Sequence, residues 1–111
     1  MKSKTFAVIA IALASFAFIA PASAQISGDV IKIGLVVDLT SVYADVTGQG
    51  VVEAVKMAIA DAGGSVNGKK VELIFGDYQN KPDVAAAMAR KWVDLEGVDV
   101  LMAATNSSAA L

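Results

Sequence analysis

The chain has 111 residues, of which 9 are basic and 11 acidic, and it contains neither cysteine nor histidine. Disulfide-stabilised folds, thiol nucleophiles, imidazole bases and the usual transition-metal ligands are therefore excluded for this sequence. Two of the basic residues lie in the first four positions. Without them 7 basic residues face 11 acidic ones, and the net charge of −4 provides no basic surface for nucleic acid or anionic lipid.

Residues 1–24 have the three-part layout of a secretory signal peptide. Two lysines begin it, and an apolar run from Phe6 to Ala20 follows. The small residues Ala22-Ser23-Ala24 then suit a signal peptidase, which predicts cleavage between Ala24 and Gln25. The run is shorter than the roughly 20 residues of a membrane-spanning helix, so a cleaved signal is favoured over an uncleaved anchor. We therefore expect an exported, periplasmic product.

The rest of the chain alternates between strand-like and helix-like segments. The apolar residues of the segment 31–37 predict a strand that is buried on both faces. Apolar residues at helical spacing in the segment 51–62 predict a helix, which ends at Gly63-Gly64. Asn67-Gly68 predicts a turn, and a second strand is expected at 71–75.

A second helix and a third strand follow. Asn80 is expected to cap the helix, and Pro82 falls in its first turn, where the missing N–H costs nothing. The helix extends past Trp92, which we expect to be a packing residue. A strand at 98–102 comes next, and the segment 105–108 then has the composition of another helix cap.

The resulting order predicts an α/β fold with a parallel sheet, flanking helices and right-handed crossovers. The three strand-to-helix loops, 38–50, 76–81 and 103–108, should then emerge at one edge of the sheet. Ligands of open α/β sheets bind outside the carboxyl ends of the strands. A binding site is therefore expected where these three polar loops meet.

Catalytic and nucleotide-binding interpretations of these loops are weak. Gly48 and Gly50 form only a G-x-G pair without the third glycine of a dinucleotide-binding loop, and the chain has no Gly-Lys-Ser/Thr phosphate loop. Asp38 follows a buried strand like an aspartyl nucleophile, but Thr40 stands where that chemistry usually has a second carboxylate. We therefore expect a binding protein and not an enzyme, with no cofactor or metal.

The polar side chains of the loops suit recognition of a ligand. Tyr43 offers an aromatic face and a hydroxyl, and the hydroxyls of Ser41, Ser107 and Ser108 can donate or accept hydrogen bonds. The N–H groups after Asn106 would point out of a helix N-terminus, which favours a carboxylate by about 0.3–2 kcal/mol. Plain N-capping explains the same residues, and because the two roles are compatible both stay open here.

Three stretches carry a resemblance to a known family. They are "IKIGLVVDLTSVYADVTGQGVVEAVKMAIADAGG", "KKVELIFGDYQNKPDVAAAMARKW" and "GVDVLMAATNSSAAL". They resemble the start of the periplasmic solute-binding proteins of branched-chain amino acid-type ABC transporters. The resemblance covers the whole chain after the signal peptide, and its first stretch is the most specific.

The resemblance implies a site as well as a fold. In that family two α/β lobes joined by a hinge close on a small ligand. The first lobe holds the ligand's carboxylate or amide with the third loop, which in this chain means Ser107 and Ser108, with Asn106 beside them. The first loop lines the cleft, here through Ser41 and Tyr43.

The second loop is implied to approach the cleft through Tyr78 or Gln79. For Tyr78 the residues by themselves favour a different role, an aromatic side chain that covers the edge of the core. Ligand contact and packing at the edge of the core are therefore both expected as possible roles of Tyr78.

The function implied by the resemblance is capture of a small amino acid, amide or carboxylic acid for import by a membrane permease. Family members are several times longer, so residues 25–111 are expected to be the N-terminal part of the first lobe and the chain a fragment. Two alternatives stay open: the ligand-sensing domain of an exported receptor, and an exported α/β hydrolase with its Gly-x-Ser-x-Gly turn elsewhere. The identity of the ligand is left open.

Overall fold

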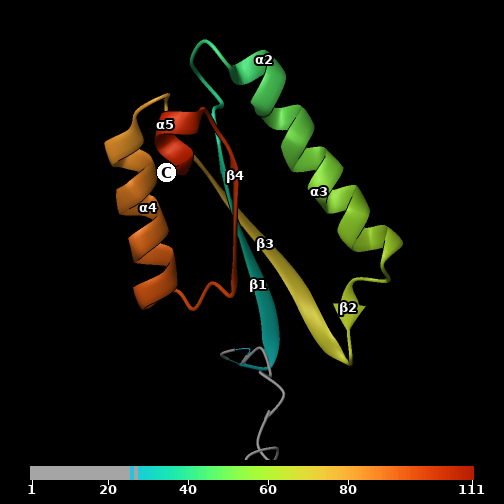
Figure 1. The fold of residues 1–111 in the computed structure, drawn as a ribbon. Coiled ribbons are helices and arrows are strands. Elements are labelled where there is room, and N and C mark those ends of the chain that lie inside the picture. The colour runs from blue at the N-terminus through green and yellow to red at the C-terminus, as the bar shows by residue number, and fades with distance from the viewer. Residues whose placement is uncertain (1–25, 27) are drawn as a thin grey trace, which may run out of the picture.

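The computed structural model describes residue 26 and residues 28–111, so the predicted signal peptide and its cleavage site lie outside the described residues (Figure 1). A four-stranded sheet carries helices on both faces. The elements in chain order are β1 (Val30–Val37), α2 (Ala44–Thr47), α3 (Gln49–Asp61), β2 (Ser65–Val66), β3 (Lys69–Asp77), α4 (Pro82–Leu95), β4 (Val100–Ala104) and α5 (Ser107–Ala110). The predicted α/β class with flanking helices is confirmed.

The sheet has the strand order β2-β3-β1-β4, with β1 parallel to both of its neighbours. The last residue of β1, Val37, pairs with Asp77 at the end of β3 and with Ala104 at the end of β4. Because the three strands end level with one another, the loops that follow them leave the sheet together, at the top of Figure 1. The sequence-based expectation of one loop edge is confirmed.

The sheet is mixed, whereas the sequence predicted a parallel one. The short strand β2 pairs antiparallel with β3 through a tight turn at Asn67-Gly68. Both turn residues have positive φ, 50° and 79°, as the favoured two-residue hairpins require. A strand of two residues leaves no periodicity in the sequence, so only the turn was foreseen.

Strand β1 is buried on both faces, as expected. On one face Leu35 and Val37 pack with Val52 of α3. On the other face Val36 packs with the α4 side chains, in the cluster described next. Helices α3 and α4 therefore cover opposite faces of the sheet (Figure 1).

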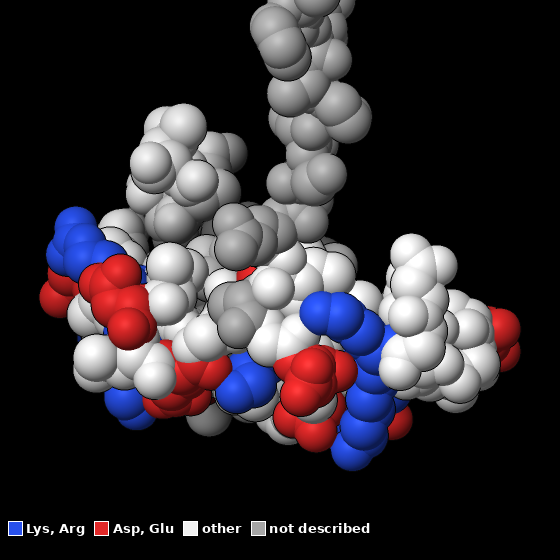
Figure 2. Space-filling view, turned by 90° about the horizontal axis from the view of Figure 1, so that it is seen from below, with Lys and Arg blue, Asp and Glu red and all other residues white. Residues whose placement is uncertain are grey.

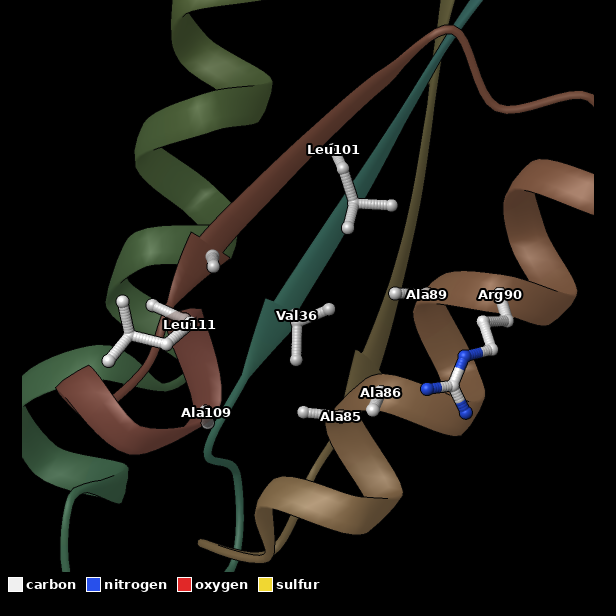
Figure 3. Close-up of a pocket in the computed structure, with 10 residues that line it drawn as sticks. Val36, Ala85, Ala86, Ala89, Arg90, Leu101, Ala109 and Leu111 are labelled. Carbon is white, nitrogen blue, oxygen red and sulfur yellow. The ribbon is translucent and has the colours of Figure 1, made fainter.

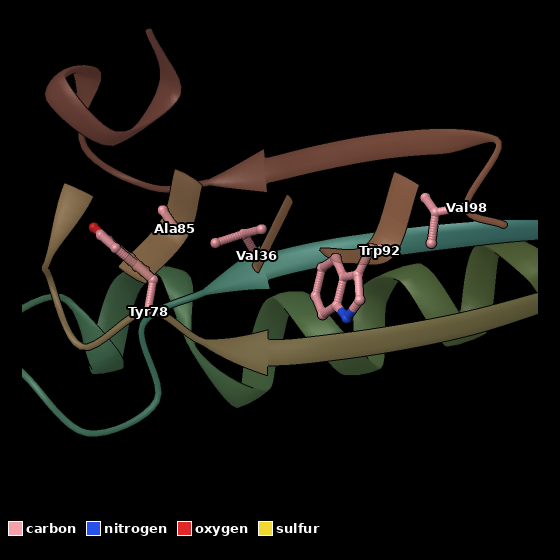
Figure 4. Packing of buried hydrophobic residues seen from close by; sticks show 5 residues of the cluster. All are labelled: Val36, Tyr78, Ala85, Trp92 and Val98. Atoms are coloured by element: carbon pink, nitrogen blue, oxygen red, sulfur yellow. The ribbon is translucent and has the colours of Figure 1, made fainter. Parts of the chain in front are cut away.

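The larger core cluster joins α4 to the sheet. Figure 4 shows Tyr78 at one end of the cluster and Val98 at the other, with Trp92 lying along the sheet between them. The indole packs closely because two strands carry glycine beneath it: a Cβ on Gly34 would lie 2.7 Å from Cε3 of Trp92, and one on Gly76 would lie 3.2 Å from its Cζ2. The expectation that Trp92 is a packing residue is confirmed.

Some element boundaries differ from those predicted. Helix α3 begins at Gln49, and a further short helix, α2, occupies part of the first loop. Asn80 does not cap α4, because the N-cap position is Lys81 and no side chain caps that helix. Strand β4 begins at Val100, since Val98 is buried against the α4 face before the strand starts.

The surface at the opposite end of the sheet carries mixed charge. Figure 2 looks onto that end, and acidic and basic side chains alternate across it without a large region of one sign. None of the helices in the described part of the chain is long and apolar enough to cross a membrane.

Candidate ligand-binding site

The first loop is built around the buried carboxylate of Asp38, which follows β1 directly and has no exposed surface. One oxygen, Oδ1, accepts hydrogen bonds from the backbone N–H groups of Thr40 (3.3 Å) and Ser41 (2.8 Å). The other, Oδ2, accepts from the N–H of Tyr43 (3.1 Å) and from the Ser41 hydroxyl. These four bonds turn the chain tightly after the strand and determine where Ser41 and Tyr43 lie.

The carboxylate of Asp77, at the end of β3, ties the second loop to the first. Its Oδ1 accepts from the N–H groups of Leu39 (3.0 Å) and Gln79 (2.9 Å). Its Oδ2 accepts from the hydroxyl of Thr40 at 2.6 Å. The two loops are thus held together through one side chain at the sheet edge.

Both carboxylates are held in the ionised form. Burial, the largest single influence, raises the pKa of Asp38, but the Ser41 hydroxyl and the backbone N–H groups of Ser41, Tyr43 and Thr40 outweigh it and lower that pKa below its ordinary value. Burial likewise raises the pKa of Asp77. The Thr40 hydroxyl and two backbone N–H groups outweigh it, against the repelling charge of Asp38, and the pKa is lowered overall. At neutral pH both groups therefore act only as hydrogen-bond acceptors.

The third loop is ordered by Asn106. Its Oδ1 accepts from the N–H of Ala109 at 2.9 Å, which caps α5, so the predicted N-cap is confirmed. Its Nδ2 donates to the side chain of Asn80, and its backbone N–H donates to the Tyr78 hydroxyl at 3.1 Å. The second and third loops are therefore joined by two hydrogen bonds. Helix α5 is a single turn of four residues.

Tyr78 has no exposed surface and belongs to the α4 core cluster (Figure 4). Tyr78 is therefore a packing residue, which agrees with the sequence-based prediction that its aromatic side chain covers the edge of the core. The direct ligand contact that the resemblance implied is not available to a side chain so buried in this structure. Its hydroxyl instead supports the backbone of the third loop, and Gln79 is the exposed residue beside it.

The other predicted site residues share one edge of the sheet. Tyr43 is 42% exposed, Ser41 is partly exposed, and Ser107 and Ser108 are exposed at the start of α5. The described residues contain no group of three or more acidic side chains that could hold a metal ion. The arrangement offers an aromatic face, several hydroxyls and no metal centre among the described residues, which suits non-covalent binding of a small polar molecule.

Sequence reasoning missed the residues that position this site. Asp77 was not singled out, Asn80 was predicted only as the cap of α4, and Asp38 was weighed only as a nucleophile. A signal was present, because an aspartate followed within three residues by threonine and serine is typical of a side-chain-closed turn. The partner of Asp77 is 38 positions away along the chain, at Leu39, and no local pattern indicates it.

An apolar hollow of about 280 Å³ lies elsewhere, between α4, β4 and α5. Figure 3 shows Val36, Ala85, Leu101 and Leu111 around it, and Arg90 is its one charged lining residue. It contains none of the hydroxyls of the three loops. We attribute it to the uncovered face beside β4, which is the edge strand of the sheet, and not to the polar site.

Comparisons with known proteins agree on the family. Residues 30–111 match the family model described as "Periplasmic binding protein". Among solved structures, a periplasmic binding protein from Burkholderia mallei is 52% identical with a TM-score of 0.72, over 74% of this chain and 22% of that chain. A search of the curated proteins found no match.

Two further solved structures are similar. A branched-chain amino acid ABC transporter periplasmic ligand-binding protein from Burkholderia xenovorans LB400 is 48% identical with a TM-score of 0.62, over 64% of this chain and 19% of that chain. A solute-binding protein of an ABC transporter from Rhodopseudomonas palustris BisB5, in complex with 3,4-dihydroxybenzoic acid, is 32% identical with a TM-score of 0.62, over 67% of this chain and 20% of that chain.

This chain thus spans about a fifth of the length of these relatives. Its mixed α/β sheet with flanking helices corresponds to the first lobe of their fold. The family that the sequence resembled is confirmed by the family model and by the solved structures together. The chain belongs to the periplasmic binding proteins, and its solved relatives include a solute-binding protein of an ABC transporter and a ligand-binding protein of a branched-chain amino acid ABC transporter.

Proposed function

We propose that the protein is the extracytoplasmic substrate-binding component of an ABC importer. It captures a small amino acid, an amide, or an aromatic or aliphatic carboxylic acid, and delivers it to a membrane permease. The observation that carries this proposal is the single polar edge formed by three hydrogen-bonded loops at the carboxyl ends of β1, β3 and β4. That is the place where open α/β sheets bind ligands.

In this proposal the loops have different tasks. Ser107 and Ser108 hold the ligand's carboxylate with hydroxyl and backbone donors, and Asn106 keeps their backbone in place through its cap. Tyr43 forms an aromatic wall, and Ser41 contacts the ligand beside it. Tyr78 acts indirectly by supporting the third loop.

The proposed role is binding without catalysis. The family consists of substrate-binding proteins, and the chain carries no histidine or cysteine to act as an imidazole base or thiol nucleophile. The carboxylates of Asp38 and Asp77 each accept hydrogen bonds from the loops that they organise. They are therefore assigned to the architecture of the site.

Export is part of the proposal. Residues 1–24 act as a cleavable signal peptide, and residues 25–111 belong to the first lobe of the binding domain. After expression in a bacterium with a secretory pathway, the product purified from the periplasm begins at Gln25. Intact-mass spectrometry measures this directly, and a soluble periplasmic product that retains Met1 would contradict the processing step.

Ligand binding is best measured in a chimera, because the chain spans only 22% of the Burkholderia mallei protein. Residues 30–111 replace the corresponding segment of that protein, and the chimera is titrated calorimetrically with leucine, benzoate and 3,4-dihydroxybenzoate. Aromatic acids are included because one relative was solved with 3,4-dihydroxybenzoic acid. Failure of all three carboxylates to bind the chimera would contradict the proposed ligand class.

Serine variants of the chimera test the site itself. Losing a hydrogen bond to a charged group costs about 1.5–3 kcal/mol, or roughly 10- to 150-fold in affinity. Ser107→Ala or Ser108→Ala, whichever removes the hydroxyl that faces the ligand, weakens binding by that factor. Ser65→Ala is the matched control, since this exposed serine lies in β2, away from the loops. If both loop variants bind like the parent, the third loop is only a helix cap.

A further inference from the structure

Two hydroxyls of the first loop, those of Ser41 and Thr40, donate hydrogen bonds to carboxylates. The Ser41 hydroxyl bonds to Oδ2 of Asp38, and the Thr40 hydroxyl bonds to Oδ2 of Asp77 at 2.6 Å. An ionised carboxylate has no proton to give, so the hydroxyl must be the donor in each of these bonds. A serine or threonine hydroxyl has one proton, and in this loop that proton is already engaged.

Each of these hydroxyls can therefore offer a ligand only its lone pairs. Ser41 is partly exposed and Thr40 is exposed, so these residues can be reached from the outside. Asp38 itself cannot, because it is fully buried and already accepts four hydrogen bonds. The first loop thus presents hydrogen-bond acceptors backed by two negative charges.

The third loop has the opposite character. Within residues 28–111, the hydroxyls of Ser107 and Ser108 make no hydrogen bond, and both residues are exposed. Their protons are free to be donated to a ligand. The same edge of the sheet therefore carries one loop that accepts and one that can donate, and a ligand that contacts both is bound in one orientation.

We propose that the first loop selects ligands by a hydrogen-bond donor. The preferred ligand carries, besides its carboxylate, an N–H or O–H group that faces Ser41. An acid without that donor binds more weakly, and a dicarboxylate binds worst, because its second carboxylate would face acceptor oxygens and the charges of Asp38 and Asp77. This inference rests on the proposed function and adds to it the chemical class of the ligand.

Four aromatic acids of similar shape test the preference in the chimera: 3-hydroxybenzoate, 4-hydroxybenzoate, benzoate and benzene-1,4-dicarboxylate. We expect the better hydroxybenzoate to bind about 3- to 10-fold more tightly than benzoate. The dicarboxylate is expected to bind at least about 10-fold more weakly than benzoate. Leucine and 4-methylpentanoate form a second pair that differs only in the ammonium group, where the expected factor is about 10- to 150-fold.

The two pairs separate the two sources of the donor. A preference in the aromatic pair assigns the donor to a hydroxyl, and a preference in the aliphatic pair assigns it to an ammonium group. Either result supports acceptor-only recognition by the Ser41 and Thr40 hydroxyls of the first loop.

Substitution of Ser41 links the preference to its cause. Ser41→Ala in the chimera removes the accepting oxygen, so the ratio of affinities for the ligand with and without the donor falls to about 1. A purely structural role would weaken both ligands of a pair equally and leave the ratio unchanged. Ser65→Ala keeps the parental ratio, because that serine lies away from the loops.

A measurement without ligand tests the direction of the hydrogen bond. If the Ser41 hydroxyl donates to Asp38, its removal in Ser41→Ala raises the pKa of that carboxyl, which ¹³C NMR of the aspartate side chains follows directly. An unchanged pKa would show that the hydroxyl proton is free to be donated elsewhere, and the inference would be overturned.

The outcomes distinguish failure of the proposed function from failure of the donor preference alone. If no acid binds the chimera, the proposed function fails and the inference with it. If acids bind but the parent prefers neither donor-bearing ligand, or Ser41→Ala retains the preference, the inference fails while the proposed function stands.

Discussion

Gly48 is the residue of the first loop where an added methyl group should be least tolerated. It is buried at the junction of α2 and α3. A Cβ at this position would overlap the carbonyl oxygen of Ala44 and lie 2.8 Å from that of Asp38. Both atoms belong to the backbone, so no side-chain rotation relieves the contact, and the loop itself must move. Overpacking of this kind costs about 1–3 kcal/mol.

Gly50 supplies the matched control two residues later. It lies in the first turn of α3, and no atom lies within 4 Å of an added Cβ. Alanine there gains about 0.5–1 kcal/mol, because glycine loses more conformational freedom in a helix. Gly48→Ala and Gly50→Ala should therefore differ by about 1.5–4 kcal/mol, with opposite signs relative to the parent.

Equilibrium urea unfolding of the chimera measures the difference, and calorimetry adds a second readout. Gly48→Ala should also weaken ligand binding, because it displaces the segment that carries Ser41 and Tyr43, whereas Gly50→Ala should leave affinity unchanged. Equal stability of the two variants would refute the close packing that we assign to the loop junction.

Three further predictions concern the core, the third loop and acid stability. Trp92→Ala should cost about 3–5 kcal/mol, measured by urea unfolding, because the indole is 7% exposed, while Val93→Ala, at a residue 54% exposed, should cost far less; equal losses would contradict the assigned packing. Tyr78→Phe leaves the backbone N–H of the third loop without its acceptor, so its hydrogen exchange should quicken and stability should fall by about 1–3 kcal/mol. Because the pKa values of Asp38 and Asp77 are lowered in the folded state, their contribution is complete above the ordinary value of 3.8 and is lost as the pH falls through the lowered folded values. The thermal unfolding midpoint of the unsubstituted chimera should therefore decrease when the pH is lowered below about 4. A midpoint that stays constant in that pH range would contradict the assignment of Asp38 and Asp77 as ionised in the folded state.

Local sequence patterns were sufficient to predict the longer helices and strands. The apolar segment of β1, the helical spacing of α3 and the glycines after it each lie within a short window of sequence. Their order along the chain implies parallel neighbours and one loop edge, because strands alternating with helices pack in few ways. Ser41, Tyr43, Ser107 and Ser108 could be placed at that edge for the same reason.

The contacts between the loops were decided by the tertiary structure. Asp77 meets Leu39 and Thr40 only because β1 and β3 pair in a register that ends both strands together. Tyr78 has an aromatic ring and a polar hydroxyl, so its residue type is compatible with a ligand cleft or with the core. In the structure it packs against α4 and is part of the core. Asn80 could cap α4 by its position, but its side chain is taken by Asn106 of the third loop.

The sequence by itself therefore determined the class of fold, the edge of the sheet where we place the candidate site and the kinds of polar group available there. Which hydroxyls still have a proton to donate depends on partners tens of residues away, such as Asp77 for Thr40, and on the ionisation of those carboxylates. Those properties arise only when the strands are aligned and water is excluded, because burial and hydrogen bonding together set the charge of a carboxyl group. The polarity of the site is for that reason a property of the folded chain.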